Sequence, residues 1–173
     1  LMKPFRKIYS LILFSFACLL GLNACSSDEE GTEPPHKEDQ LVMAISYEPS
    51  EDLLAVADIK LTYTDGYGQK HTEAVKKKFE KSVIIVAFPI NAGYEVCVTP
   101  KTSYEKKESY NIAMKEWVNI TRNGIPVTGL PKSVKLPGVT DIEGLLRKGT
   151  LNTKTYFHFN AEGEFVAEPT DSI

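Results

Sequence analysis

The sequence predicts an all-β domain with one short helix, folded as an antiparallel β-sandwich. From Leu41 onward, apolar and polar residues alternate with the period of two that marks strands. Turn-forming residues interrupt this alternation about every ten residues, which gives about eight short strands. Only one segment carries a helix-capping pattern. Immunoglobulin-like and transthyretin-like arrangements both fit, and the Cys, Trp, Cys spacing of antibody-type domains is absent.

The chain begins with a basic segment and an apolar run. Lys3, Arg6 and Lys7 precede the run at 8–22, which as a helix would be about 22 Å long, shorter than the hydrocarbon core of a bilayer at about 30 Å. We therefore expect residues 1–24 to form a signal peptide. Its removal leaves 17 of the 20 Lys and Arg and all 23 Asp and Glu, so the remainder carries 17 − 23 = −6. This balance disfavours a nucleic-acid partner.

The segment Leu22-Asn23-Ala24-Cys25 has Leu three positions before a Cys and a small residue directly before it. It resembles the lipobox of bacterial lipoproteins. The resemblance implies that a diacylglycerol is attached to Cys25, that the preceding residues are removed, and that the new amino terminus is acylated with a fatty acid such as palmitate. Each buried methylene contributes about 0.8 kcal/mol, so several acyl chains would hold the protein on a membrane.

Residues 25–40 are expected to form an acidic, flexible tether, because they contain Pro34-Pro35 and no periodic apolar positions. The tether begins with Ser26-Ser27-Asp28-Glu29-Glu30, which resembles the surface-export signal of Bacteroidota lipoproteins. That resemblance implies display on the outer membrane facing the medium, with the periplasmic leaflet as the alternative. In layout the chain resembles short Bacteroidota lipoproteins with a single β domain.

The folded domain is expected to span 41–168, followed by a tail at 169–173. The stretch at 69–79 is polar and contains three consecutive lysines, as protected edge strands do. Residues 83–88 are apolar on both faces, which predicts a central strand covered on both sides. Residues 125–139 contain three prolines and are expected to be irregular apart from a short strand at 133–136. The other expected strands are 41–47, 55–64, 93–99, 110–121, 153–160 and 164–167.

One helix is expected at 140–148. Thr140 and Glu143 have the spacing of a capping box, Leu145 and Leu146 supply an apolar face, and Gly149 suits the C-terminal stop.

The sequence contains no phosphate loop, nucleophile elbow, His-Glu-x-x-His motif or calcium loop. His71 and His158 lie in expected strands without a second ligand-type residue two positions on, so we expect no metal and no cofactor. Cys97 is expected to be a small buried residue under the helix or a second layer. The strand carboxylates show no spacing that favours an acid–base pair, and we expect a protein without enzymatic activity; they are Asp58, Glu95 and Glu116.

Two exposed aromatic residues are the candidate ligand contacts. By strand parity Trp117 shares the polar face of its strand with Lys115 and Asn119, and Tyr156 shares a polar face with His158. Aromatic ring faces beside amide and hydroxyl groups are how glycan-binding sandwiches stack sugars. The alternative is a bulge that returns Trp117 to the core, or a second apolar layer under the helix.

These observations predict a membrane-anchored, surface lipoprotein that acts as a binding or accessory module for a glycan, a peptide or a surface protein. The alternative is a structural subunit of a surface assembly, paired through the polar edge at 69–79 or the terminal hairpin. An enzyme is the third interpretation. The oligomeric state is not predicted.

Overall fold

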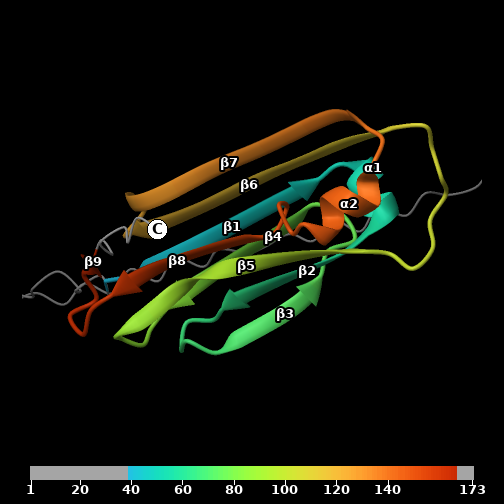
Figure 1. Ribbon diagram of the computed structural model, residues 1–173. Helices are drawn as coiled ribbons and strands as arrows, with labels where there is room; N and C mark the ends of the chain where they lie inside the picture. The colour runs from blue at the N-terminus through green and yellow to red at the C-terminus, as the bar shows by residue number, and fades with distance from the viewer. Residues whose placement is uncertain (1–38, 167–173) are drawn as a thin grey trace, which may run out of the picture. The chain divides into compact units, whose positions relative to one another are not determined.

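Two antiparallel sheets face each other around one core in the computed structural model, which describes residues 39–166 (Figure 1). The expected signal peptide at 1–24, the lipidation site Cys25, nearly all of the tether and the tail at 169–173 lie outside these residues. Within 39–166 no helix is both long and apolar enough to cross a membrane.

The first sheet has four strands in the order β4-β1-β6-β7. These are β4 (Phe79–Ile85), β1 (Leu41–Pro49), β6 (Tyr110–Arg122) and β7 (Ile125–Val139).

The second sheet has five strands in the order β3-β2-β5-β8-β9. They are β3 (Lys70–Ala74), β2 (Ala57–Thr64), β5 (Ile90–Pro100), β8 (Thr153–Phe159) and β9 (Phe165–Val166). Two short helices, α1 (Glu51–Val56) and α2 (Ile142–Arg147), connect the sheets and lie at the same end of the sandwich (Figure 1). The predicted all-β sandwich is confirmed.

The core consists of the alternate residues that each strand points inward, as period-two patterning requires. In β1 these residues are Leu41, Met43, Ile45 and Tyr47, each no more than 2% exposed. The inward residues predicted for β2, β5 and β6 are also buried; they are Ala57, Ile59, Leu61, Tyr63, Tyr94, Val96, Val98, Tyr110, Ile112, Met114, Val118 and Ile120. One apolar core thus holds the two sheets together.

Glu116 is the one charged residue buried among the inward positions of the described strands. Its Oε2 accepts a hydrogen bond of 2.8 Å from the Tyr94 hydroxyl on the opposite sheet, whereas Oε1 has no partner among the described residues. Burial, and then the nearby charge of Glu116, raises the pKa of both Tyr94 and Tyr47. The carboxylate therefore ties β6 to β5 through a polar contact inside the apolar core.

Two tight turns contain the residue pairs Asp65-Gly66 and Asn123-Gly124. In the β2–β3 turn, Asp65 Oδ1 accepts hydrogen bonds of 2.9 Å from the backbone N–H groups of Tyr67 and Gln69. The β6–β7 hairpin turns at Asn123 and Gly124, both with positive φ (53° and 81°), as a two-residue hairpin loop of the primed type needs.

The prediction of a central strand at 83–88 is wrong. Among the described residues, β4 is an edge strand of its sheet and pairs only with β1. Its outer face is not covered either, since Ile84 is 51% exposed and Val86, just after the strand, is 52% exposed. Beyond β4, the backbone N–H groups of Val86 and Ala87 both donate to Gly66 O at 3.0 Å. The β2–β3 turn, rather than another strand, accepts these hydrogen bonds.

The irregular segment predicted at 125–139 is also wrong, because β7 is a continuous strand of 15 residues. An edge strand tolerates Pro126, Pro131 and Pro137, since it needs no amide donors on its outer side. Register shifts between Tyr110 and Ile112, and between Ile120 and Thr121, absorb the irregularity in the β6–β7 pair.

The described residues contain two short helices where the sequence predicted one, and α1 is the helix that was not predicted. Residues 55 and 56, expected in a strand, belong to α1, where the Ser50 side chain caps the helix by accepting from Leu53 N. Helix α2 is confirmed, but its N-cap is Asp141 rather than Thr140, since Asp141 Oδ1 accepts from Gly144 N at 2.9 Å. Both side chains serve the orphan N–H groups of a helix start.

Candidate ligand-binding site

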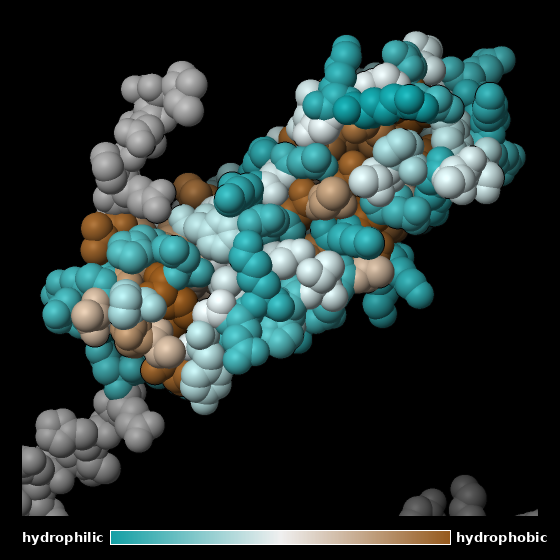
Figure 2. All heavy atoms as spheres, turned by 60° about the horizontal axis from the view of Figure 1, so that its bottom comes forward, coloured by the Kyte–Doolittle hydropathy of each residue, from teal (hydrophilic) through white to brown (hydrophobic). Residues whose placement is uncertain are grey.

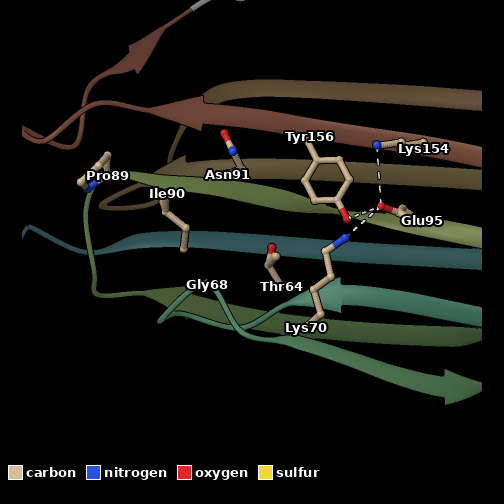
Figure 3. A pocket seen from close by; sticks show the side chains of 9 residues that line it. All are labelled: Thr64, Gly68, Lys70, Pro89, Ile90, Asn91, Glu95, Lys154 and Tyr156. Carbon is tan, nitrogen blue, oxygen red and sulfur yellow. Dashed lines mark hydrogen bonds and ion pairs between the residues drawn. The ribbon is translucent and has the colours of Figure 1, made fainter.

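A cavity of about 560 Å³ opens on the outer face of the five-stranded sheet. Figure 2 brings this side of the molecule forward and shows a mainly hydrophilic face with apolar surface between the polar side chains. Four strands (β2, β3, β5 and β8), the β2–β3 turn and the β4–β5 connection line it; the residues are Thr64, Gly68, Lys70, Pro89, Ile90, Asn91, Glu95, Lys154 and Tyr156 (Figure 3). Chain segments far apart in the sequence thus converge on one site.

The cavity lies where the backbone pairing of β2 with β5 ends. The last backbone pair is Tyr63 with Tyr94. Beyond this pair, the buried Thr64 side chain makes the hydrogen bonds to β5 in place of backbone groups. Its Oγ1 accepts from Gly93 N at 2.9 Å, and its hydroxyl donates to Gly93 O at 3.3 Å. This keeps Thr64 fixed while the chain turns away toward Gly68.

Gly93 allows β8 to approach β5 closely at the cavity. It is paired with Tyr156, and a Cβ added to Gly93 would lie 2.0 Å from Thr155 O and 2.7 Å from Tyr156 Cα. No side chain fits in that space, since these contacts are to backbone atoms. The absence of a side chain at Gly93 therefore lets the Tyr156 backbone come this close.

Tyr156, Lys70 and Lys154 converge on a single carboxylate oxygen, Glu95 Oε1 (Figure 3). The Tyr156 hydroxyl donates to it at 2.8 Å, the Lys70 ammonium donates at 3.2 Å, and the Lys154 ammonium lies 3.9 Å away. Both ammonium groups lie 5.5 Å from the centroid of the Tyr156 ring, within cation–π range.

These contacts fix the protonation states of the site. The hydrogen bond from Tyr156, followed by that from Lys70, lowers the pKa of Glu95. Burial and then the hydrogen bond to Glu95 raise the pKa of Tyr156, and the hydrogen bond to Glu95 raises the pKa of Lys70. At neutral pH the group formed by Glu95, Lys70 and Tyr156 therefore consists of a carboxylate, an ammonium and a neutral phenol.

Asn91 and Ile90 form the wall next to Tyr156. Asn91 Oδ1 lies 2.8 Å from His158 Nδ1, and as the acceptor in this pair it leaves its NH₂ group to face a ligand. Ile90 is buried and offers apolar surface to the cavity. The site can thus bind a ring through Tyr156 and Ile90 and hydroxyl groups through Asn91, Glu95 and Lys70.

The five candidate residues do not form one site. Tyr156 lines the cavity, and His158 adjoins it through Asn91. Trp117, Lys115 and Asn119 lie instead on the outer face of the four-stranded sheet, which points the opposite way. Strand parity predicts whether a residue faces outward but not which sheet carries it. The sequence therefore could not show that Tyr156 and Trp117 lie on different sheets.

Trp117 points away from the core, as predicted, and is 43% exposed. The register through it is regular, with Ser46 opposite on β1 and Pro131 opposite on β7, so no bulge returns it to the core. Its neighbour Lys115 forms an ion pair of 3.7 Å with Glu48.

Eight cavity residues were not predicted as ligand contacts, and Glu95 among them was considered only for an acid–base pair; they are Thr64, Gly68, Lys70, Pro89, Ile90, Asn91, Glu95 and Lys154. Alternation does place Glu95 on the outer face of its strand. The missing information was the strand order, because only the pairing of β5 with both β2 and β8 brings these segments together.

His71 and Cys97, the other residues considered for metal binding or catalysis, do not line the cavity. No group of three His, Cys, Asp or Glu residues in 39–166 is arranged to hold a metal ion. His71 Nε2 lies 2.8 Å from Asp65 Oδ2 in the β2–β3 hairpin. Cys97 is exposed, so its expected burial is wrong: no helix or second layer among residues 39–166 covers the outer face of β5 at that position.

Comparisons with known proteins leave the site to be interpreted from its own chemistry. No known protein family matches the chain, and no curated protein or solved structure shows significant similarity to it.

Proposed function

We propose that the protein is a lipid-anchored, surface-displayed binding module that takes up a saccharide in the cavity beside Tyr156. The observation that carries this proposal is the convergence of an aromatic ring with a carboxylate, an ammonium, an amide and an apolar side chain on one cavity. No enzymatic activity is assigned to it.

A saccharide fits this combination of groups. Sugar rings present an apolar face that packs on aromatic carbon, and hydroxyl groups that both donate and accept hydrogen bonds. The cavity of about 560 Å³ lies within the range of small-molecule sites, about 300–1,000 Å³. The hydrogen bonds among Tyr156, Glu95 and Lys70 fix their positions before a ligand arrives, which reduces the entropy lost on binding.

Binding has better support than hydrolysis. Glycoside hydrolysis by the usual route needs two carboxyl groups on either side of the scissile bond. The lining of this cavity contains one, Glu95, and its Oε1 already accepts hydrogen bonds from Tyr156 and Lys70.

The alternative role in edge-strand pairing has less support, because each described sheet edge carries a feature that hinders strand addition. Charged residues flank β3, prolines interrupt β7, and β9 has two residues. The β2–β3 turn accepts the amide donors that follow β4.

A glycan array tests the saccharide proposal. The probe is the chain from residue 25 with Cys25→Ser, which contains the whole described sandwich and lacks the acylation site. We expect reproducible binding to a set of related glycans, and loss of that binding in Tyr156→Ala. Binding that survives Tyr156→Ala, or no binding above background, would contradict the proposal.

The anchor is tested separately, in cells that express the whole chain. Metabolic labelling with an alkyne analogue of palmitate should mark the protein, and Cys25→Ala should abolish the label. Proteinase added to intact cells should degrade the protein. Protection until the outer membrane is permeabilised would place it on the periplasmic leaflet instead.

A further inference from the structure

Two ammonium groups face one carboxylate in the cavity. Lys70 and Lys154 line it, and Glu95 is the one acidic side chain in the lining, so the lining carries one positive charge in excess. The whole sandwich has no such excess: residues 39–166 contain 16 Lys and Arg and 16 Asp and Glu, which gives 16 − 16 = 0. The positive charge is therefore a local property of the site.

Lys154 is the ammonium that the described residues satisfy least. It makes no hydrogen bond within 39–166, and its contacts are the 3.9 Å ion pair with Glu95 Oε1 and the cation–π contact with Tyr156. Its side chain is 73% exposed. Glu95 Oε1 already accepts from Tyr156 and Lys70, so Lys154 keeps its N–H donors for another acceptor.

The two lysines approach from opposite sides of the site. Figure 3 shows Lys70 reaching in from β3 and Lys154 from β8, with Glu95 and the Tyr156 hydroxyl between them. An acidic group held by both ammonium groups would lie beside the ring of Tyr156, where the sugar that carries it can pack.

We propose that the bound saccharide is acidic, and that Lys70 and Lys154 bind its carboxylate or sulfate group. This inference rests on the proposed saccharide site and adds the class of sugar. Glu95 is a positioning residue in this arrangement, because it holds the Tyr156 hydroxyl and Lys70 in place.

The test uses an array of matched acidic and neutral glycans: oligogalacturonates and their methyl esters, and sulfated galactans and their desulfated forms. The strongest pair is then measured by isothermal titration calorimetry with the chain from residue 25 carrying Cys25→Ser. We expect the acidic member to bind at least tenfold more tightly than its neutral match. Whether uronates or sulfated galactans give the signal identifies the acidic group.

Variants then assign the effect to the lysines. Lys154→Ala should weaken binding of the acidic glycan at least fivefold and leave the neutral one unchanged, whereas Lys154→Arg should retain most of the affinity. Lys132→Ala, which removes an exposed lysine from β7 of the other sheet, is the matched control and should change nothing.

The outcomes separate this inference from the proposal on which it rests. Equal binding of acidic and neutral members, lost in Tyr156→Ala but unchanged in Lys154→Ala, would overturn the acidic class and keep the saccharide site. No binding to any member would overturn both.

Discussion

The outer faces of the two sheets each present an aromatic residue, but of these two residues it is Tyr156 that lines the candidate ligand cavity. On the five-stranded sheet, Tyr156 lines this cavity and its hydroxyl donates a hydrogen bond to Glu95. On the four-stranded sheet, the cross-strand neighbours of Trp117 are the uncharged Ser46 and Pro131, and Lys115 on the same face pairs with Glu48 at 3.7 Å. The side chains that neighbouring strands supply therefore decide whether an exposed aromatic residue can form part of a ligand site.

Gly93 on the five-stranded sheet and Gly129 on the four-stranded sheet also differ in how closely the neighbouring strand approaches them. Gly93 lies against the backbone of β8, whereas Gly129 on β7 faces Asn119 Oδ1 and Val118 O at 3.2 Å. A side chain would therefore have less room at Gly93, next to the cavity, than at Gly129.

The largest expected effect is on stability. Gly93→Ala should lower the free energy of unfolding by about 2–3 kcal/mol, since the new methyl group overlaps backbone atoms that cannot move aside. Gly129→Ala is the matched control and should cost less than about 1 kcal/mol, because contacts at 3.2 Å need only small shifts. Urea denaturation measures both. Equal losses of unfolding free energy in the two variants would contradict the steric difference between Gly93 and Gly129.

Removing one hydroxyl group should weaken the ligand site without unfolding the protein. Tyr156→Phe keeps the ring but leaves Glu95 without its shortest hydrogen bond, so we expect saccharide affinity to fall by about 1–2 kcal/mol. Trp117→Ala, on the other face, should leave the affinity within twofold. Calorimetric titration compares them, and a larger loss in Trp117→Ala would move the site to the four-stranded sheet.

The acid titration of Glu95 should report the same hydrogen bond. Its carboxylate is stabilised in the folded protein, so its midpoint should lie below the ordinary value of about 4.3. The stability that this group contributes is present above the ordinary pKa and is lost as the pH falls through the lowered one. Carbon-detected NMR of the side-chain carboxyl measures the midpoint, which should rise in Tyr156→Phe. An unchanged midpoint would mean that the tyrosine does not stabilise the carboxylate.

The smallest expected effect concerns the ion pair beside Trp117. Lys115→Ala should change the free energy of unfolding by no more than about 0.5 kcal/mol, because both partners are exposed and 3.7 Å apart. Saccharide affinity should not change either. A clear loss of affinity in this variant would show that the face around Trp117 contributes to binding.

The sequence predicted the sandwich because alternation in β1, β2, β5 and β6 directly reflects burial. It misplaced β4 and β7 because edge and central strands are defined by their neighbours, which no local pattern contains. The apolar outer residues Ile84 and Val86 look like those of a covered strand, and the prolines of β7 look like those of a loop.

The candidate site was predicted only in part, for the same reason. Strand parity correctly placed Tyr156 and Trp117 on the outer faces of their strands, but bringing Lys70, Glu95 and Tyr156 together requires the order β3-β2-β5-β8.

The net charge of the chain lies outside the described sandwich. Residues 39–166 are neutral in total, so the −3 of the whole chain comes from residues 1–38 and 167–173, with 4 − 7 = −3.

Chemical-shift mapping can locate the saccharide site on the sandwich directly. The chain from residue 25 with Cys25→Ser is labelled with ¹⁵N and titrated with the glycan that binds most tightly on the array. We expect the largest amide shifts at Thr64, Asn91, Glu95 and Tyr156, with little change at 115–119. Shifts centred on Trp117, or no shifts at saturating glycan, would contradict it.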